Sequence, residues 1–244
     1  MIINPYLFGV ASTLNTSLYA VYKAESNAND SLATYNGTAI GGLTYAAGKS
    51  GNAFKFNGTN SYVNIPDNSM NLTGDFSISF WVYVTASGSQ YIYQNGFYQT
   101  SPTNIYKGFS IGIDTLGSST YNLCCVIPRQ TTDYLGWQFN SLTNNAWNHV
   151  IITRVSGVDT YAWINNTLSA VTYQGPISAG NKILDPTYHT TQRVSLGASV
   201  ASGTAGALIN ANSLIDEFNV WTRQLTSTER TNLYNAGAGK FYPY

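Results

Sequence analysis

Hydrophobic and polar residues alternate most regularly between Asp75 and Val84. A period of two over ten residues predicts a β-strand with an aliphatic side that faces a core. The predicted inward side holds Phe76, Ile78, Phe80, Val82 and Val84, and the other side holds Ser77, Ser79, Trp81 and Tyr83.

A second alternating segment, residues 213–221, is followed by a helix signature. Thr226 stands three residues before Glu229, which is the spacing of a capping box, and Gly237 can end the helix in a left-handed conformation. One strand, a short connector and one short helix are therefore predicted near the C-terminal end. One strand face is predicted to hold Leu214, Asp216, Phe218 and Val220, and the other Ile215, Glu217, Asn219 and Trp221.

Shorter segments of the same kind follow one another along the chain, and no long helical periodicity interrupts them. Many short strands with one late helix predict an all-β fold, an antiparallel two-sheet sandwich. Residues 54–65 read as a hairpin with Asn57-Gly58 in its turn, residues 88–108 as a long insertion and residues 175–191 as an irregular loop. The remaining predicted strands are residues 17–24, 109–113, 121–127, 147–155, 159–164 and 193–196.

Four ordered segments resemble the laminin-G-like, concanavalin A-like jelly-roll modules. They are residues 48–66, residues 76–82, residues 147–165 and residues 215–237. The resemblance implies a jelly-roll sandwich with one short C-terminal helix, and it extends from about Ser17 to Gly237. It divides the chain into an N-terminal arm of residues 1–16, a laminin-G-like domain of residues 17–240 and a tail of residues 241–244. The fold alone leaves the function open, because lectins, adhesion modules, enzymes and structural proteins share it.

Charged residues make up only 9% of the chain and the formal net charge is zero, against a usual charged share of roughly 25%. No basic patch is present to bind a phosphate backbone, so nucleic acid is not expected as a partner. With 43% hydrophobic residues the chain can build a core. Its surface is then left to neutral hydrogen-bonding side chains, among which 19 tyrosines are prominent.

The first ten residues contain no Lys or Arg, and Pro5 interrupts their apolar run. They do not resemble a signal peptide and are too short to span a membrane, so membrane insertion is not expected. Cys124 and Cys125 are adjacent and would point to opposite faces of a strand, which predicts two free thiols. Free thiols favour assembly in a reducing cytoplasm.

The resemblance also implies a calcium ion, mainly as a structural brace outside the sandwich. The positions that match the family's ligands are Asp30, Asn57 or Gly58, and Asp216. Carboxylate and carbonyl oxygens are the ligands that Ca²⁺ prefers. The alternative is that Asp30 caps its loop and Asp216 pairs with a donor such as Arg154.

Two groups of aromatic residues with Asn and Gln nearby are candidates for sugar binding. Sugars stack their apolar faces on aromatic rings and form hydrogen bonds with amides and hydroxyls around them. The alternative is that the rings fill a subunit interface or pack beneath a loop, because Tyr and Trp are also enriched at interfaces. The candidates are Tyr91, Tyr93, Tyr98 and Tyr106 in the insertion, and Tyr134 and Trp137 beyond it.

Catalytic residues are not evident. Asp216 and Glu217 are the only adjacent carboxylates, and a regular strand would turn them to opposite faces, where they could not act as a glycosidase pair. His149 and His189 have no nucleophile motif beside them. The sequence therefore predicts a protein that is not an enzyme.

The resulting hypothesis is a non-catalytic glycan-binding or adhesion module displayed on a phage or virus particle, as a decoration, fibre or tail component. Its expected partners are a surface glycan, virion proteins and sister subunits of a homo-oligomer, with the arm docking by strand addition. The expected location is the virion, after assembly in the host cytoplasm. One alternative is a purely structural virion or subunit-interface protein that binds no sugar. Another is a bacterial surface module of the lectin type, located outside the cell.

Overall fold

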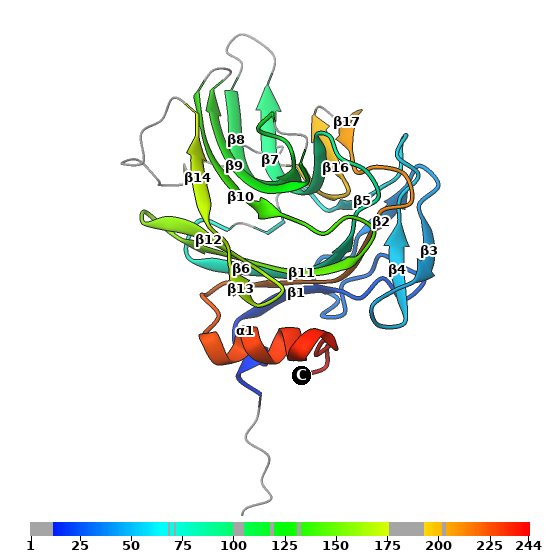
Figure 1. Ribbon diagram of the computed structural model, residues 1–244. Helices are drawn as coiled ribbons and strands as arrows, with labels where there is room; N and C mark the ends of the chain where they lie inside the picture. Colours follow the sequence, from blue (N-terminus) through cyan, green and yellow to red (C-terminus); the bar gives the residue numbers. More distant parts are fainter. Residues whose placement is uncertain are drawn as a thin grey trace, which may run out of the picture.

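The computed structural model describes residues 12–67, 69–70, 72–99, 105–117, 120–130, 133–175, 193–201 and 204–244. Two eight-stranded antiparallel sheets, called sheet A and sheet B below, face each other across a hydrophobic core (Figure 1). The α-helix α1 (Ser227–Tyr234) lies beneath sheet A. This arrangement confirms the predicted all-β antiparallel sandwich with a short C-terminal helix.

Sheet A has the strand order β13-β12-β11-β6-β18-β4-β3, and β1 pairs with β18 off this path. The cleanest alternating segment of the sequence, β6, is therefore a central strand. The strands of sheet A are β1 (Leu18–Tyr22), β3 (Thr44–Ala47), β4 (Asn52–Lys55), β6 (Phe76–Tyr83), β11 (Trp147–Val155), β12 (Asp159–Ile164), β13 (Thr167–Leu168) and β18 (Leu214–Trp221).

Sheet B has the order β14-β10-β9-β8-β7-β15-β5-β2, and a separate two-stranded hairpin, β16–β17, accompanies it. Its strands are β2 (Thr38–Ile40), β5 (Tyr62–Ile65), β7 (Gln90–Gln99), β8 (Ile105–Ile113), β9 (Asn122–Gln130), β10 (Asp133–Ser141), β14 (Val171–Gln174) and β15 (Arg193–Leu196). The hairpin consists of β16 (Ala198–Ala201) and β17 (Thr204–Leu208).

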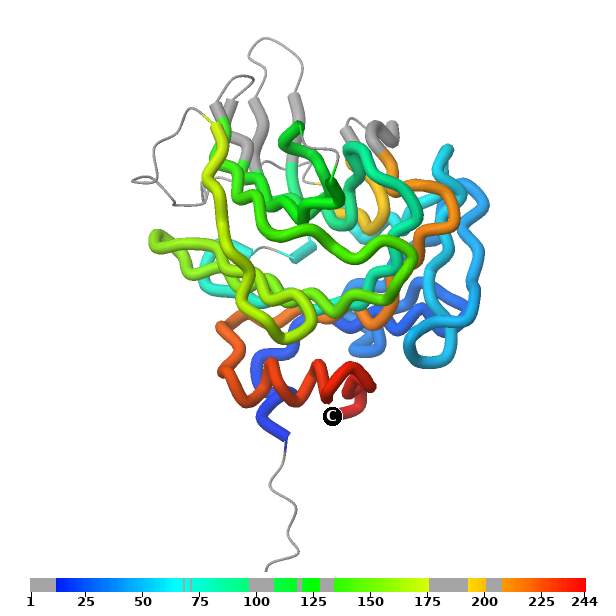
Figure 2. The backbone as a smooth tube through the Cα atoms, viewed as in Figure 1, coloured from blue at the N-terminus to red at the C-terminus, as the bar shows by residue number. Residues whose placement is uncertain are grey.

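Both faces of β6 are buried, which the alternation of the sequence did not indicate. Phe76, Ile78 and Phe80 face the core as predicted. The polar side is buried because the C-terminal segment covers the outside of sheet A, and Trp81 stacks with Tyr234 of α1 at a ring distance of 6.2 Å. Figure 2 shows the first described residues and the C-terminus together on this side of the molecule.

The predicted face assignment of β18 is wrong in its middle. The register between β18 and β6 shifts between Asp216 and Asn219, and Glu217 has a φ of 48°. This β-bulge rotates the strand, so Phe218 still reaches the core while Asp216 and Glu217 both lie outside it. Strict alternation could not reveal the bulge, because a bulge adds one residue to the period.

The capping box is confirmed. The Thr226 hydroxyl accepts a hydrogen bond from the Glu229 N–H at 3.2 Å, and the Glu229 carboxylate accepts one from the Thr226 N–H at 2.8 Å. The helix ends earlier than predicted, because Asn235 rather than Gly237 adopts the left-handed capping conformation. No helix in the described ranges is long and apolar enough to cross a membrane.

Candidate functional site

The outer face of sheet B is the surface that points away from the core. Gln138 of β10 lies opposite Thr172 of β14 on one side and Cys124 of β9 on the other. The residue before Gln138 in β10, Trp137, points inward and belongs to the core. Alternate residues of β14, β10 and β9 therefore form one outward row.

The hairpin β16–β17 covers the middle of this face at β7 and also packs against Tyr62 of β5 and Ile40 of β2. The Gln94 side chain of β7 accepts a hydrogen bond from the Val200 N–H at 2.7 Å. The neighbouring Gln90 side chain accepts one from the Asn210 N–H at 3.0 Å. On the other side of β7, strands β9, β10 and β14 form the part of the outer face that is called the open end below.

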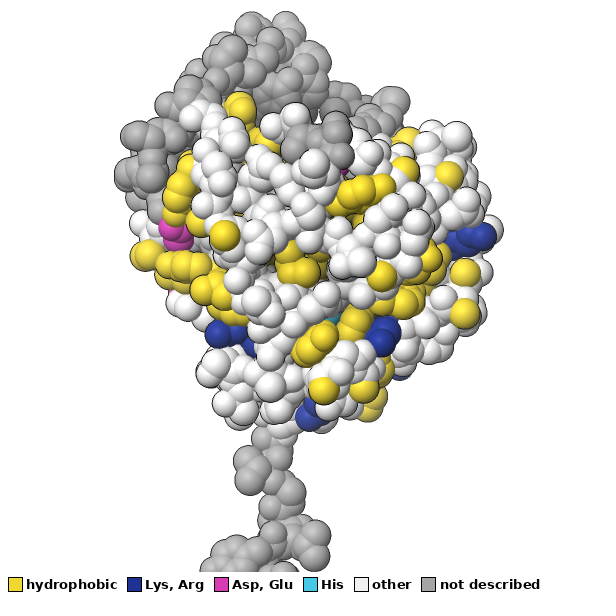
Figure 3. All heavy atoms as spheres, viewed as in Figure 1, with side chains coloured by type: hydrophobic (Ala, Val, Ile, Leu, Met, Phe, Trp, Pro, Cys, Tyr) yellow, Lys and Arg dark blue, Asp and Glu magenta, His cyan; other side chains and the backbone are white. Residues whose placement is uncertain are grey.

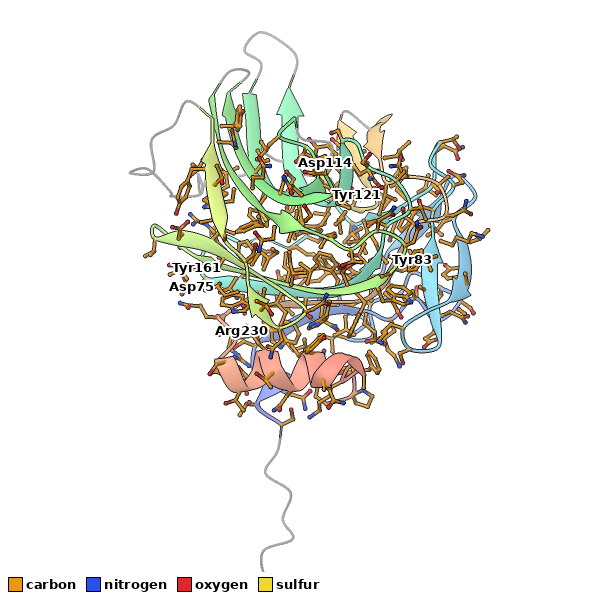
Figure 4. All side chains as sticks on the ribbon, in the orientation of Figure 1. Asp75, Tyr83, Asp114, Tyr121, Tyr161 and Arg230 are labelled. Carbon is orange, nitrogen blue, oxygen red and sulfur yellow. The ribbon has the colours of Figure 1, made fainter. Side chains whose placement is uncertain are left out.

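A loop between β8 and β9 borders this open end, and Asp114 holds its shape. The Asp114 carboxylate accepts hydrogen bonds from the backbone N–H groups of Gly88, Tyr121 and Asn122 at 2.9–3.1 Å. Asp114 is itself buried. Figure 4 labels Asp114 and Tyr121 close together in the upper part of the molecule. The loop is thus fixed where it meets the first residue of β9.

The loop can lie flat on the sheet because two residues beneath it are glycines. A Cβ atom on Gly112 would lie 2.5 Å from the Thr115 Cγ2 atom. A Cβ atom on Gly136 would lie 2.8 Å from the Leu116 Cδ1 atom. Thr115 and Leu116 thereby form one wall of the open end.

A groove of about 350 Å³ remains next to this wall. Two of its side chains are oriented by their neighbours. The Ser141 hydroxyl donates to the Asn122 side-chain oxygen at 2.7 Å, and the Gln174 amide donates to the Gln138 side-chain oxygen at 3.3 Å. The groove is lined by Asn122, Gln138, Phe139, Asn140, Ser141, Ala170 and Thr172.

The side-chain amides that line the groove have N–H donors available for a ligand. Within the described part of the chain, the amide nitrogens of Asn122 and Gln138 donate no hydrogen bond, and the exposed Asn140 side chain forms none. An amide offers two donors and one acceptor oxygen, and Thr172 adds a hydroxyl that can do both. The groove carries no ionisable side chain. Such a surface suits a neutral ligand rich in hydroxyl groups.

The aromatic residues predicted to bind sugar fall into three groups. Tyr91 and Tyr134 are half-buried. Burial, and then the nearby Cys124, raise the pKa of Tyr91. Gly175 has a φ of 101°, and a Cβ atom there would lie 3.0 Å from the Tyr134 ring. The side chains of Tyr98 and Tyr106 lie outside the described residues.

The prediction is wrong for Tyr93 and Trp137, because both side chains are fully buried in the core. A register shift between Tyr91 and Tyr93 turns these two residues of one strand to different sides. Trp137 lies between the inward Leu135 and Phe139. The alternation of residues 134–140 already indicated that Trp137 points inward, because the polar or small residues on either side of it face the groove.

The predicted calcium ligands do not fit a metal site. The two Asp30 carboxylate oxygens accept hydrogen bonds from four backbone N–H groups, at 2.9–3.1 Å. The Asn57 side-chain oxygen accepts three backbone N–H groups, and the Asp216 carboxylate accepts three more. A cation would have to displace these donors. Asp30 is thus a loop cap, whereas the predicted Asp216–Arg154 pairing is wrong, because Asp216 binds the backbone of residues 49–50.

The loop-cap role of Asp30 leads to a test. We expect Asp30→Asn to lower the free energy of unfolding by about 1–3 kcal/mol, because the amide NH₂ would face two N–H donors in either orientation. Chelation with EDTA should leave the melting temperature unchanged, and Asp67→Asn at an exposed ion pair should have a smaller effect. Thermal unfolding followed by circular dichroism measures the effects of Asp30→Asn, of EDTA and of Asp67→Asn. A melting temperature that falls on EDTA treatment and is restored by calcium would contradict the loop-cap account.

The acidic pair of β18 does not form an open active site. The bulge brings Asp216 and Glu217 to the same side of sheet A, contrary to the sequence prediction, but both are buried. Burial raises the pKa of Asp216 to about 7 and, together with the Asp216 charge, that of Glu217 to about 8. His149 is also buried, which lowers its pKa to about 3, and its Nε2 atom lies 3.0 Å from the Ser79 hydroxyl. His189 lies outside the described residues.

Comparison with known proteins agrees with the sandwich and with the resemblance read from the sequence. The family model described as the concanavalin A-like lectin/glucanases superfamily matches residues 57–229. Domain 4 of AbnA, an extracellular arabinanase from Geobacillus stearothermophilus solved with arabinotriose, has a TM-score of 0.62 at 18% identity. That alignment covers 92% of this chain and 98% of the domain. No curated protein matches the sequence.

Two further similar structures are larger binding domains. The binding domain of botulinum neurotoxin DC in complex with SialylT has a TM-score of 0.63 at 17% identity, with 91% of this chain and 52% of that chain covered. The binding domain of Paraclostridial Mosquitocidal Protein 1 has a TM-score of 0.62 at 18% identity, with 91% and 52% covered. The chain thus spans about half the length of these two domains. At such identities the likeness concerns the fold.

Proposed function

The chain belongs to the concanavalin A-like lectin/glucanase superfamily, and we propose that it is a non-catalytic module that binds a neutral glycan in the groove of sheet B. One observation carries the proposal. The open end of the outer face gathers amide and hydroxyl side chains from three strands, with no ionisable group among them. Sugar hydroxyls both donate and accept hydrogen bonds, as these side chains do.

The similar structures support a carbohydrate ligand for this fold. Two of them are complexes with a sugar: the arabinanase domain with arabinotriose and the neurotoxin domain with SialylT. The groove of this chain favours the neutral kind, because no Lys or Arg lines it to pair with a sugar carboxylate.

The position of the acidic residues supports a binding role without catalysis. Glycoside hydrolysis uses two carboxyl groups on either side of the scissile bond. No carboxylate lines the groove. Asp216 and Glu217 belong to sheet A and are buried beside the C-terminal tail, where burial and the Glu217 charge raise the Tyr244 pKa. Among the described residues that line the groove of sheet B, none could act as an acid or a base on a bound sugar.

We further propose that the module is displayed on a phage or virus particle, with its attachment at the end opposite the groove. The Trp221 indole donates to the Leu14 carbonyl at 2.7 Å, and Arg223 donates to the Thr13 and Thr16 carbonyls. These bonds hold residues 13–16 outside sheet A, beside the C-terminus. An attachment through the arm would leave the groove of sheet B facing outward. Immunoblotting of gradient-purified particles for this chain tests the display proposal. Absence of the chain from the particle fraction would contradict it.

A glycan array tests the binding proposal. We expect the full chain to bind a subset of neutral oligosaccharides equally well with and without EDTA. Binding restricted to sialylated or uronic-acid glycans would contradict an uncharged groove as the site. Binding to no glycan would leave the purely structural alternative.

A further inference from the structure

The exposed hydrophobic side chains of the described residues are concentrated in one segment. The five large ones that are most exposed, at 38–57%, all lie between residues 158 and 173. Hydrophobic atoms follow the left side of the molecule over β12 and β14 in Figure 3. Contiguous exposed apolar surface marks an interaction site more often than scattered residues do. The five are Val158, Tyr161, Leu168, Val171 and Tyr173.

This segment forms an edge of the sandwich. Within the described ranges, β13 is the last strand of sheet A, and β14 is the last strand of sheet B and pairs with β10 alone. An edge strand presents unpaired N–H and C=O groups and is normally protected by lysine, proline or a bulge. The β14 sequence Val171-Thr172-Tyr173-Gln174 contains neither lysine nor proline, and its register with β10 has no bulge.

The opposite edge of sheet B also lacks lysine, proline and a bulge, but it exposes less apolar surface. Its last strand, β2, has exposed Thr38 and Ala39, and none of the five exposed large hydrophobic residues belongs to it. The two edges of one sheet therefore differ in apolar exposure. This difference locates the interaction surface at β14, with the apolar side chains of β12 and β13 beside it.

We propose that β14 pairs antiparallel with β14 of a second copy of this chain. The segment is compatible with its own copy because β14 is uncharged. Asp159, a described acid close to β14, is engaged within the chain, by the Trp137 indole at 2.7 Å and by the Tyr173 hydroxyl. Antiparallel pairing about a two-fold axis would therefore bring no like charges together, which is what an isologous interface requires. Leu168 and Val171 would add apolar burial to the main-chain hydrogen bonds.

The geometry of such a pair has a consequence for the groove. A two-fold axis that relates antiparallel edge strands is perpendicular to the sheet, so both copies of sheet B show the same outer face. Thr172 belongs both to β14 and to the groove lining, so the two grooves would lie on either side of the seam. Under the proposed function, the dimer would bind a polymeric glycan at two points and gain avidity. The dimer itself does not depend on sugar binding.

Light scattering after size exclusion tests the dimer without any ligand. We expect a mass of about twice 26.5 kDa for the full chain at tens of micromolar. The double variant Leu168→Lys, Val171→Lys should raise the dimer dissociation constant at least ten-fold, because it would replace two apolar side chains of each copy with positive charges at the seam. Thr38→Lys on β2 is the matched control and should leave the mass unchanged. A monomeric wild-type chain at 100 µM, or a dimer that persists in the double variant, would overturn the proposal.

Hydrogen exchange on the wild-type chain provides a second readout that needs no variant. Raising the protein concentration from 1 to 100 µM should slow the exchange of the β14 amides at least several-fold and leave the β2 amides unchanged. Protection that appears at β2 and not at β14 would place the interface at the other edge and overturn the proposal.

Discussion

Replacing Arg154 with methionine should raise the free energy of unfolding by about 1–4 kcal/mol. The Arg154 side chain is fully buried between the sheets, and its three guanidinium nitrogens have no hydrogen-bond partner in the described part of the chain. Burial lowers the Arg154 pKa, although Asp159 and Asp75 favour its charge. Asp159 accepts hydrogen bonds from the Trp137 indole and the Thr160 N–H, and Asp75 accepts them from the Ser156 N–H and the Gln224 amide. Methionine would keep the apolar stem against the Trp137 ring and remove a buried charge that has no hydrogen-bond partner among the described residues.

Chemical denaturation of the wild type and the variant measures this difference. The matched control is Arg223→Met. The Arg223 guanidinium bonds to both carboxylate oxygens of Glu229 and to the carbonyls of Thr13 and Thr16, so its loss should lower the stability. A destabilised Arg154→Met variant would mean that the buried guanidinium has a bound partner, and the account of an unpaired charge would be wrong.

The stability of the protein should fall as the pH rises from about 4 to 8, by at least about 2 kcal/mol. The folded-state pKa values of Asp216, about 7, and Glu217, about 8, exceed their ordinary values of 3.8 and 4.5. The folded state therefore binds more protons than the unfolded state in this window, and its stability is lost as the carboxyls ionise. His149 acts in the opposite direction, because its lowered pKa favours the fold only as the pH rises from 3 toward 6.5. Above pH 6.5 the fall in stability is caused by the ionisation of Asp216 and Glu217.

Glu217→Gln isolates the larger part of this effect. Burial and the Asp216 charge both disfavour the Glu217 carboxylate, and an amide of the same shape removes both costs. We expect little change in the free energy of unfolding at pH 5 and a gain of about 1–3 kcal/mol at pH 8.5. Urea denaturation at the two pH values measures it, with Asp67→Asn at the exposed ion pair with Arg193 as the control. Equal effects at both pH values would show that the Glu217 charge does not govern the pH dependence.

Local sequence patterns predicted the elements of the fold well where the strands are regular. The alternation in β6 predicted the correct core face, because the register of β6 with β11 runs without a shift. The Thr226–Glu229 spacing located the start of α1, because a capping box is a local hydrogen-bond pattern. The predictions failed at Glu217, whose left-handed conformation creates the bulge of β18. They also failed at Tyr93, where a register shift reverses the strand face.

The site was harder to predict, because it depends on contacts between segments distant in sequence. Tyrosine and tryptophan were the expected sugar contacts, but Tyr93 and Trp137 are in the core. The groove gathers residues from β9, β10 and β14, and the pairing of these strands has no local signature in the sequence. Gln138 and Asn140 could have been found from the strand alternation alone, since they lie on the polar side of β10.

Isothermal titration with the strongest neutral oligosaccharide from the array tests the central claim most directly. We predict that the double variant Gln138→Ala, Asn140→Ala weakens binding at least ten-fold, because each lost hydrogen bond contributes about 0.5–1.5 kcal/mol. Asn64→Ala, an amide at the far edge of the same outer face, should bind like the wild type. Circular dichroism should show that both variants keep the sandwich. Unchanged affinity in the double variant, with the fold intact, would contradict the groove on sheet B as the glycan site.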